Sequence, residues 1–398
     1  NADPAAEVRA DPLAGYPPPG ASPAEVAAWW NKVPAELRPQ LIQQHPELIG
    51  NRDGIPVTAR DQANRILIGR QREALVAERT RLEGQLLDDH SPGGQSLNPA
   101  IRSQIDRING KISGIDAINA RLDSQPTVSR DADGFFLLGV DPSSEGRFIV
   151  ARGNPDTAKN VATFVPGSLT DLSQADGLLN QGDALHRAAV RAGSPQIADG
   201  PSTSVITWLD YDSPDSIPGA IWPGKAEDGA ARLVSFQEGL RTTHAPGPPA
   251  HTTVVGHSYG STVAGFAASQ GRTLAADEII GAGSPGFGVD TADQLSVGKE
   301  HVWVVESPHD PIADTSVFGA DPSENGFGAR VYNSEPGPPV GSAIPSTSGY
   351  SPYSPGNKLP QYDYTVAAHD SYLREPPGGN AGLDTMGQII AGNNPPPR

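Results

Sequence analysis

The sequence predicts an α/β fold in which a mostly parallel, doubly wound sheet follows an N-terminal helical hairpin. From residue 126 onwards, short β-branched runs alternate with helical runs, the order expected when helices join parallel strands. Before that point, two proline-free helical runs flank a Ser-Pro-Gly-Gly break at 91–94. Residues 252–266, T-T-V-V-G-H-S-Y-G-S-T-V-A-G-F, pass from a strand pattern to a helix pattern through a Gly-x-Ser-x-Gly turn.

Length and composition favour one sizeable core with an additional module. The chain has 398 residues, 36% of them hydrophobic, and its 45 glycines and 40 prolines indicate many loops and turns. Its 46 acidic residues outnumber 29 basic ones, which gives a formal charge of −17. We therefore expect no nucleic-acid partner and no polybasic membrane anchor, because both depend on Lys and Arg.

The residue types and spacings that are missing exclude several kinds of functional site. There is no cysteine, which excludes disulfides, thiolate zinc sites and a cysteine nucleophile. No zinc-type His-x-x-x-His or His-Glu-x-x-His spacing occurs, so we predict neither a metal nor another cofactor. No apolar run approaches the roughly 18 residues that span a bilayer. The chain begins at Asn1, and we expect a soluble protein, either cytoplasmic or exported with its signal already removed.

The N-terminal part is expected to contain an arm and then a helical hairpin. Residues 1–57 predict an extended arm and short helices, the first over 24–30 with Ser22 as its cap. Residues 58–125 predict an antiparallel helical hairpin whose first helix, 58–87, starts at Thr58 or Asp61. The second helix carries an apolar seam at Ile101, Ile105, Ile108, Ile112, Ile115 and Leu122. This seam favours packing within the protein over the alternative, a dimerisation or partner-binding arm.

Residues 126–398 are expected to form the catalytic domain. An antiparallel pair of strands is predicted at 135–141 and 147–152. Further strands are predicted at 161–165, 204–209, 278–280 and 301–306, and one more enters the Gly-x-Ser-x-Gly turn. Helices are predicted at 169–192, 229–242 and 385–391 and after that turn. Residues 334–361, rich in Pro, Ser, Gly and Tyr, predict a long ordered loop or a lid.

The Gly-x-Ser-x-Gly turn has the features of a nucleophile elbow. Ser258 requires a strained turn that exposes its hydroxyl, and Gly256 and Gly260 avoid a Cβ that would collide with the neighbouring strand or helix. The following helix directs its backbone N–H groups toward the serine, where they favour an oxyanion. A chance pentapeptide is the alternative, but the strand before and the helix after argue against it.

A serine nucleophile needs a base that is oriented by an acid. In the fold that uses this motif, the chain order is serine, acid, histidine. Asp310 lies in the loop after the strand that ends at Glu306, at the edge where catalytic groups of such sheets gather. Only His301, His309 and His369 follow the serine, and with Asp310 taken as the acid, His369 is the remaining base.

Each assignment has an alternative. In the alternative for the acid, Asp310 is a plain turn aspartate and Glu306 or Asp314 orients the histidine. In the alternative for the base, His369 caps a surface helix. His257 is expected to pack beneath the elbow, and His301 to be structural.

The sequence also suggests groups that bind the substrate. The N–H of Tyr259 is one oxyanion donor by geometry, and the N–H of Ser168 is the second, because Gly167 allows close approach of the backbone. An ordinary strand-ending turn is the alternative for this loop. Tyr211 and Trp222 are candidates for an apolar acyl pocket, although simple packing accounts for such aromatics as well.

Several stretches together resemble a largely uncharacterised actinobacterial α/β-hydrolase domain family over residues 30–375. They are N-V-A-T-F-V-P-G (160–167), W-L-D-Y-D-S-P (208–214), V-V-G-H-S-Y-G-S (254–261), G-S-P-G (283–286) and A-H-D-S-Y (368–372). A-R-D-Q-A-N-R (59–65), which follows D-G-I-P, is similar to the helical segment that precedes this domain in the family. The resemblance implies an α/β-hydrolase fold with an N-terminal helical extension, and it implies no particular substrate.

Two functional hypotheses follow. The first is a serine hydrolase of the carboxylesterase or lipase type, acting through an acyl-enzyme on a small-molecule or lipid ester. Peptidase and thioesterase activity stay open, because the triad is indifferent to the leaving group. The alternative is a secreted or surface interaction protein with a weak or vestigial hydrolase domain and a hairpin that binds a partner.

Overall fold

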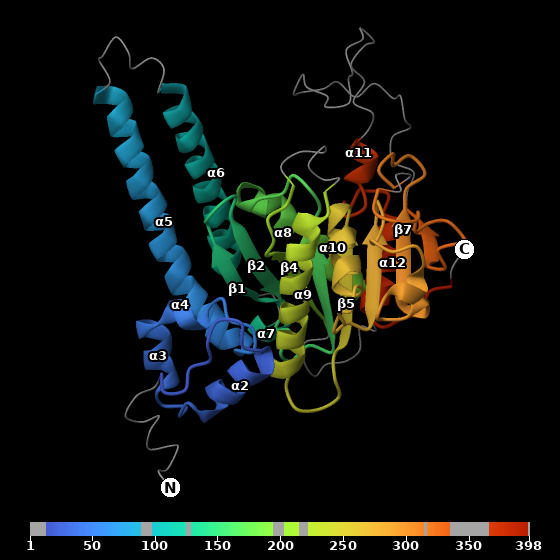
Figure 1. Cartoon of the computed structure of the whole chain (residues 1–398), viewed down its shortest axis with the longest axis horizontal. Coiled ribbons are helices and arrows are strands. Elements are labelled where there is room, and N and C mark those ends of the chain that lie inside the picture. The colour runs from blue at the N-terminus through green and yellow to red at the C-terminus, as the bar shows by residue number, and fades with distance from the viewer. Residues whose placement is uncertain are drawn as a thin grey trace.

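The computed structural model describes residues 13–88, 98–124, 129–193, 203–214, 222–313, 317–334 and 366–396. Within those residues the centre of the molecule is an eight-stranded sheet with the order β1-β2-β4-β3-β5-β6-β7-β8 (Figure 1). The strands are β1 (Phe135–Asp141), β2 (Arg147–Arg152), β3 (Asn160–Val165), β4 (Thr203–Leu209), β5 (His251–His257), β6 (Glu278–Ala282), β7 (Val302–Glu306) and β8 (Arg330–Asn333).

The sheet is mostly parallel with an antiparallel start, as predicted. β1 pairs antiparallel with β2 and β2 with β4, whereas β3 to β8 join through parallel pairs. The predicted hairpin has the bounds of β1 and β2. β8 was not predicted, because only Tyr332 of its four residues is buried and the sequence signal is correspondingly weak.

Helices cover both faces of the sheet (Figure 1). One core contains residues of α9 (Gly224–Thr243) and α10 (Tyr259–Ala267), and a second contains residues of α8 (Ala175–Ala192) and α12 (Ala381–Ile390). β3 supplies both cores, because successive side chains of a strand point to opposite faces. Val161 belongs to the first core and Ala162 to the second.

The remaining helices precede the sheet or border it. They are α2 (Pro23–Lys32), α3 (Arg38–Gln44), α4 (Pro46–Ile49), α5 (Val57–Asp88), α6 (Asn98–Leu122), α7 (Arg130–Asp133) and α11 (Val366–His369), with 3₁₀ turns η2 (Leu172–Gln174), η4 (Ala292–Gln294) and η5 (Lys299–His301). Ser22 caps α2 as predicted, and Glu25 completes a capping box. α5 and α6 form the predicted helical hairpin, which projects beyond the sheet (Figure 1).

Side chains from α5 and from the turn before it occupy the open edge of β1. They bond six backbone groups of the strand: Arg65 donates to Phe135 O, Asp61 accepts from Leu137 N, Asn64 donates to Leu137 O, Arg60 donates to Leu138 O, and Asn51 pairs with both Val140 N and Val140 O. We call Arg60, Asp61, Asn64 and Arg65 the anchor cluster. It satisfies an edge strand that would otherwise present free donors and acceptors.

Several predicted helix boundaries were wrong. Thr58 and Asp61 lie inside α5, and the N–H of Val57 at its start donates instead to Asp156 Oδ2 at 2.7 Å. The helix predicted from 169 begins at 175, because Leu169 has a left-handed φ of 60°. α9 and α12 start at 224 and 381, ahead of the predicted 229 and 385. The loop predicted at 334–361 lies, apart from its first residue, outside the described residues.

Candidate active site

The elbow has the strained backbone that its motif predicts. Ser258 stands between β5 and α10 with φ 54° and ψ −130°. Such a conformation costs a non-glycine residue about 1–3 kcal/mol and persists only where neighbours hold it. Ser258 N–H donates to Ala282 O at 2.9 Å, and the Ser261 hydroxyl donates to Ser258 O at 2.6 Å. The Ser258 side chain is half-buried and keeps access to solvent.

The two glycines of the motif are required by close contacts. A Cβ on Gly256 would lie 2.4 Å from Ser261 Cα, and one on Gly260 would lie 2.1 Å from Val165 O. Both contacts are with backbone, which does not move aside as a flexible side chain does. Larger residues at either position would therefore displace the strand or the helix that holds Ser258.

Asp310 and His369 form a buried hydrogen-bonded pair. His369, at the end of α11, places Nδ1 2.8 Å from Asp310 Oδ2, in the turn that follows β7. An ionised carboxylate only accepts, so Nδ1 of His369 carries the proton and Nε2 is left for another partner. Among the described residues, Asp310 is the carboxylate paired with His369; Asp314 lies outside them.

A tyrosine that the sequence did not single out completes the pair. Tyr372 donates its hydroxyl to Asp310 Oδ2 at 2.7 Å and accepts from Ser307 N–H at 2.9 Å, while Ile312 N–H donates to Asp310 Oδ1. We call Asp310, His369 and Tyr372 the imidazole cluster. Burial raises the pKa of Asp310, but the hydrogen bonds from His369, Tyr372 and Ile312 outweigh burial and hold that pKa below its usual value. In the sequence, Tyr372 was visible as the final residue of the stretch A-H-D-S-Y (368–372), two positions after the residue that follows His369.

Gly283 lies directly over the hydrogen bond of this cluster. It has φ +57°, and a Cβ there would stand 2.7 Å from Asp310 Oδ2 and 3.0 Å from His369 Nδ1. Any side chain would push the carboxylate and the imidazole apart. The glycine of G-S-P-G is thus required by the pair beneath it.

His257 joins the imidazole cluster to the elbow. Its Nε2 lies 2.9 Å from the carbonyl oxygen of His369, and the two rings are 4.8 Å apart between centroids. Burial, with the nearby His369 adding to it, lowers the pKa of His257 to about 4, so the ring is neutral at pH 7 and donates from Nε2. His257 therefore packs beneath the elbow, as expected, and brings His369 beside the residue that precedes Ser258. Among the described residues, no direct hydrogen bond joins Ser258 Oγ to His369.

The loop after β3 lies against the serine. A Cβ on Gly167 would be 2.7 Å from Ser258 Cβ and 3.2 Å from Ser258 Oγ, so Ser168 follows the point of closest approach. Tyr211 donates its hydroxyl to Pro166 O at 2.6 Å, and Thr170 donates to Gly167 O at 2.7 Å. These bonds hold the loop backbone in place beside the elbow.

The two predicted substrate contacts occupy different environments. Tyr211 is buried and stacks between Trp208 and Tyr259, with ring centroids 6.1 and 6.4 Å away. Trp222 has 70% of its surface exposed, and its carbonyl accepts from the hydroxyl of Tyr259 at 3.0 Å. Tyr211 thus supports the loop from below, Trp222 lies at the surface, and their contact with substrate stays a prediction.

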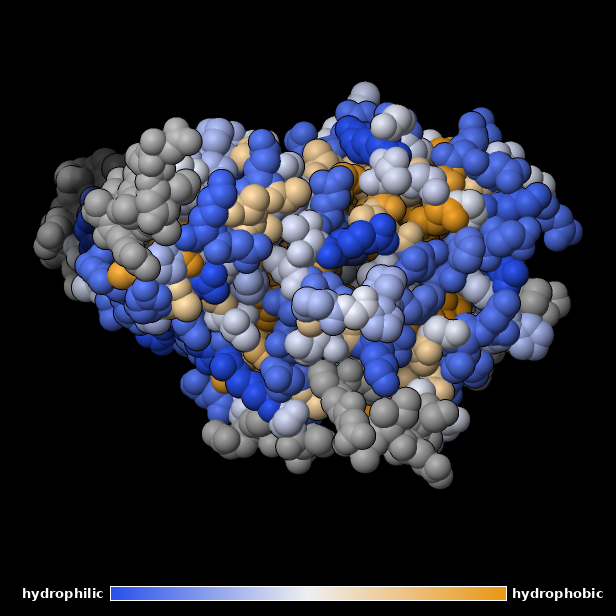
Figure 2. Space-filling model, turned by 90° about the horizontal axis from the view of Figure 1, so that it is seen from below, coloured by the Kyte–Doolittle hydropathy of each residue, from blue (hydrophilic) through white to orange (hydrophobic). Residues whose placement is uncertain are grey.

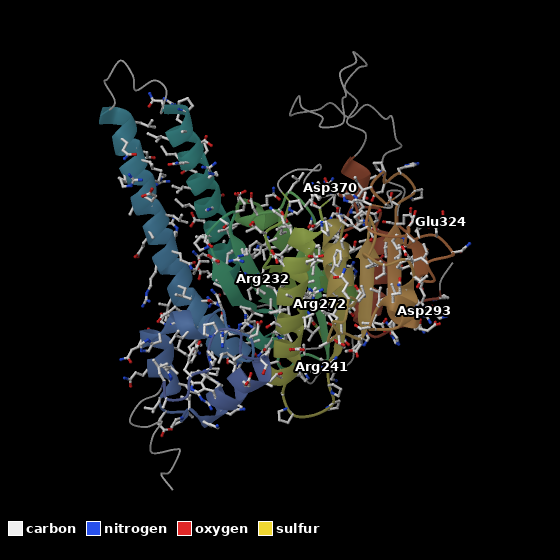
Figure 3. All side chains as sticks on the ribbon, viewed as in Figure 1. Arg232, Arg241, Arg272, Asp293, Glu324 and Asp370 are labelled. Atoms are coloured by element: carbon white, nitrogen blue, oxygen red, sulfur yellow. The ribbon has the colours of Figure 1, made fainter. Side chains whose placement is uncertain are left out.

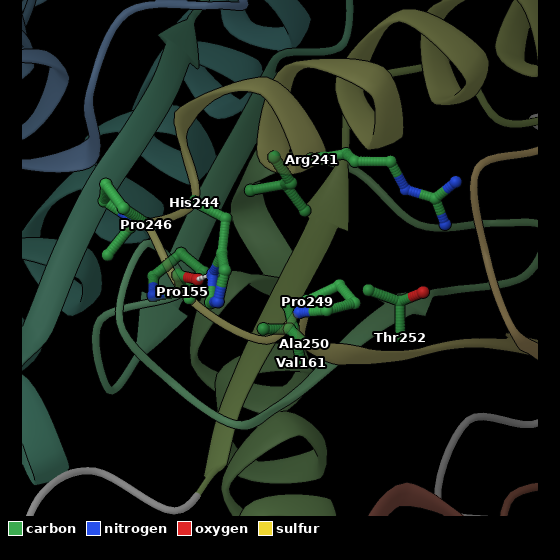
Figure 4. Close-up of a pocket in the computed structure, with 11 residues that line it drawn as sticks. Pro155, Val161, Arg241, His244, Pro246, Pro249, Ala250 and Thr252 are labelled. Carbon is green, nitrogen blue, oxygen red and sulfur yellow. Dashed lines mark hydrogen bonds between the residues drawn. The ribbon is translucent and has the colours of Figure 1, made fainter.

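A separate pocket lies at the opposite end of the strands. It has a volume of about 260 Å³ and lies between the end of α9 and the starts of β3 and β5 (Figure 4). In Figure 3, Asp370, which follows His369, is labelled near the upper edge of the sheet, and Arg241 of this pocket is labelled near its lower edge. The lower face carries mainly hydrophilic residues with small apolar areas between them (Figure 2). This pocket is remote from Ser258 and forms no part of the candidate site.

The described residues also bear on metal binding and on membrane insertion. Among the described residues, no group of three or more His, Asp or Glu side chains is arranged to hold a metal ion. Within the same part of the chain, no helix combines the length and apolar character that crossing a membrane requires.

Comparisons with known proteins bear on the family of this chain. Residues 141–320 match the model of an α/β-hydrolase family. An uncharacterised protein of Mycobacterium tuberculosis is 31% identical over 373 residues, which cover 85% of this chain and 53% of that protein. An uncharacterised protein of Mycobacterium bovis is 29% identical over 226 residues, covering 54% of this chain and 80% of that protein.

The chain therefore spans about half the length of the first of these relatives. The family match includes β3, the elbow and Asp310, and His369 lies beyond it. A mostly parallel sheet with a strained serine between β5 and α10 is the arrangement that this family match implies. The described sheet thus has the α/β-hydrolase fold, and residues 141–320, which contain the elbow, match an α/β-hydrolase family.

Proposed function

We propose that this protein is a serine carboxylester hydrolase that acts through an acyl-enzyme. The observation that carries the proposal is the Asp310–His369 hydrogen bond of 2.8 Å, whose histidine also accepts, at its backbone oxygen, a hydrogen bond from His257, the residue before the strained Ser258. A serine hydroxyl becomes a useful nucleophile only with such an oriented imidazole nearby.

In the proposed reaction, Ser258 Oγ bonds to the ester carbonyl carbon while His369 Nε2 takes the hydroxyl proton. Asp310 keeps His369 in the required tautomer and stabilises the imidazolium. The N–H groups of Tyr259 and Ser168 receive the negative charge on the carbonyl oxygen. His369 then protonates the departing alcohol as the carbon–oxygen bond breaks, and a water molecule repeats these steps to release the acid.

The direct Ser258–His369 hydrogen bond is the contact that substrate binding must close. Catalytic hydrogen bonds are often long or poorly aligned in a free enzyme and tighten in the complex. Ser258 is half-buried and therefore accessible to a substrate, while His369 is buried next to Asp310.

Labelling with a fluorophosphonate tests the proposal. The probe should attach to Ser258, and the protein should hydrolyse p-nitrophenyl esters. Ser258→Ala should lose labelling and at least about 10⁴-fold in kcat, because nucleophile and base act as a unit. Ser103→Ala, on the outer part of α6, is the matched control and should retain both. A well-folded protein that resists the probe and cleaves no ester would contradict the proposal.

Dimerisation through the hairpin stays a prediction. The outer seam residues Ile101, Ile105 and Ile108 are half-buried, and α5 packs against α6. Light scattering across a range of protein concentrations measures it directly, and a constant monomer mass would contradict it.

A further inference from the structure

Three exposed apolar side chains belong to segments that contact Ser258 or the residue after it. Among the described residues, the large hydrophobic side chains with high exposure are Leu169 at 46%, Val190 at 45%, Trp222 at 70% and Val317 at 45%. Val190 lies near the C-terminal end of α8, a helix that makes none of the contacts with Ser258 or Tyr259 described above. The other three belong to segments that bond or pack against the residues flanking Ser258, and we call them the apolar rim.

Leu169 is held in an unfavourable conformation that leaves its side chain in water. Its φ of 60° lies in the left-handed region, which is costly for a residue with a Cβ. The loop keeps it there through Leu169 N–H to Pro214 O at 2.8 Å and through Gln174 Nε2 to Leu169 O at 2.8 Å. Gly167, two residues earlier, is the residue in close contact with Ser258. A strained leucine is thus presented next to the proposed oxyanion donor.

Trp222 and Val317 belong to two segments that contact Tyr259, the residue after the nucleophile. The hydroxyl of Tyr259 donates to Trp222 O at 3.0 Å and accepts from Ala226 N–H at 3.1 Å. Val317 precedes Phe318, whose ring meets the Tyr259 ring edge-on with centroids 5.6 Å apart. Both exposed side chains therefore belong to segments braced against the side chain that follows Ser258.

Exposed apolar groups on several segments that border one site indicate contact with an apolar partner, because they gain free energy by leaving water. A partner that must approach Ser258 in every reaction cycle is the acyl portion of the ester. The formal charge of −17 disfavours an anionic lipid surface as the partner. The rim itself consists of two aliphatic side chains and one indole, which suit an uncharged hydrocarbon chain.

We propose that Leu169, Trp222 and Val317 form an acyl-binding rim that selects esters of long, uncharged acyl chains. The inference rests on the proposed serine hydrolase function and names the substrate class of the same site. It predicts that kcat/KM rises with acyl length, because each added methylene finds apolar surface on the rim.

The test compares p-nitrophenyl acetate with p-nitrophenyl decanoate. The variants are Leu169→Ser, Trp222→Ser and Val317→Ser, and the matched control is Val190→Ser, whose side chain has the same 45% exposure as Val317. The wild-type protein should prefer decanoate. Each rim variant should lower the decanoate-to-acetate ratio of kcat/KM about tenfold, the size of one lost apolar contact in a specificity pocket. Val190→Ser should leave the ratio unchanged.

Fluorophosphonate labelling of Ser258 separates the two possible failures. If the probe labels Ser258 and acetate is cleaved, but the ratio is the same in rim and control variants, the rim inference is overturned and the surface serves another partner, such as a polypeptide. If wild type prefers acetate, the inference is overturned as well. If the folded protein neither labels nor cleaves any ester, the proposed function fails and the rim inference fails with it.

Discussion

Two buried aspartates organise two polar clusters of different design. Asp61, at 1% exposure, accepts from Leu137 N–H and from the guanidinium groups of Arg65 and Arg130. Arg65 in turn donates to a backbone carbonyl of β1, Phe135 O. The bonds of the anchor cluster thus begin and end within the fold.

The imidazole cluster is open at one end. Asp310, at 2% exposure, accepts from His369, Tyr372 and Ile312, and His369 still has a ring nitrogen that is not used by the carboxylate. In the anchor cluster, Asn64 Oδ1 is buried without a partner, but every bond that the cluster makes ends on the fold itself. Such a network holds structure together, whereas a histidine with a ring nitrogen left for another partner is available for chemistry. The two clusters should therefore respond oppositely to the same substitution.

The largest contrast is expected from Asp310→Asn. The amide no longer holds His369 in the required tautomer, so kcat for p-nitrophenyl esters should fall about 10⁴-fold while the protein stays folded. Ester hydrolysis and urea denaturation measured on one preparation check both parts. A variant with near wild-type kcat would remove Asp310 from the proposed triad.

The matched substitution, Asp61→Asn, should act on stability instead. It keeps the volume but removes the charge that pairs with Arg65 and Arg130. We expect a loss of about 3 kcal/mol in the free energy of unfolding, the low end for a broken buried ion pair, because both arginines reach solvent. kcat per folded molecule should be unchanged. A large loss of kcat at full stability would show that the two clusters do not differ as argued.

Buried histidines extend the comparison to pH. Burial lowers the pKa of His257 to about 4, and burial together with Arg152 lowers that of His186 to about 4. In the unfolded chain each group has its ordinary pKa of about 6.5. The unfolded state therefore binds more protons in this range, and the stabilisation present above pH 6.5 is lost as pH falls toward 4, by about 3 kcal/mol for each histidine.

His257→Asn and His186→Asn should each reduce the slope of unfolding free energy against pH between 6.5 and 4. Only His257→Asn should also change ester hydrolysis, because only His257 contacts the imidazole cluster. Urea denaturation at several pH values measures the slopes. Equal slopes in wild type and both variants would contradict the assigned shifts.

The smallest effect is expected from Tyr372→Phe. Losing the hydroxyl removes one donor from Asp310 and raises the pKa of that carboxyl, so activity should be lost at a higher pH on the acid side. We expect about a tenfold fall in kcat/KM at neutral pH, the size of one hydrogen bond to a charged group. Tyr332→Phe, which removes the bond from another tyrosine hydroxyl to Pro395 O, is the control and should keep the wild-type pH profile.

The sequence was most informative where chemistry allows few residue types. A serine triad needs a histidine, and only three histidines follow Ser258, so elimination selected His369. Its hydrogen bond to Asp310 is present, while the catalytic roles of both residues stay predictions. Strand and helix alternation likewise predicted the parallel sheet, because that pattern repeats along the chain.

The sequence was least informative where partners lie far apart along the chain. Asp61 was predicted as a possible helix cap, yet its partner Leu137 is 76 residues away. The residue that accepts from Val57 N–H at the start of α5 is Asp156, which is 99 residues further along the chain. Tyr372 and Gly283 have no periodic signal, because loops bring them to Asp310. Local patterns do not record contacts that depend on tertiary packing.

The stack of Trp208 on Tyr211 gives the protein an optical reporter of its own. The hydroxyl of Tyr211 donates to the carbonyl oxygen of Pro166, in the loop that lies against Ser258. Any shift of that backbone during acylation therefore moves the Tyr211 ring against the fully buried ring of Trp208. The chain has five tryptophans, and replacing the other four with phenylalanine would leave emission from Trp208 alone. Stopped-flow fluorescence could then time the formation and decay of a covalent intermediate without any chromogenic leaving group.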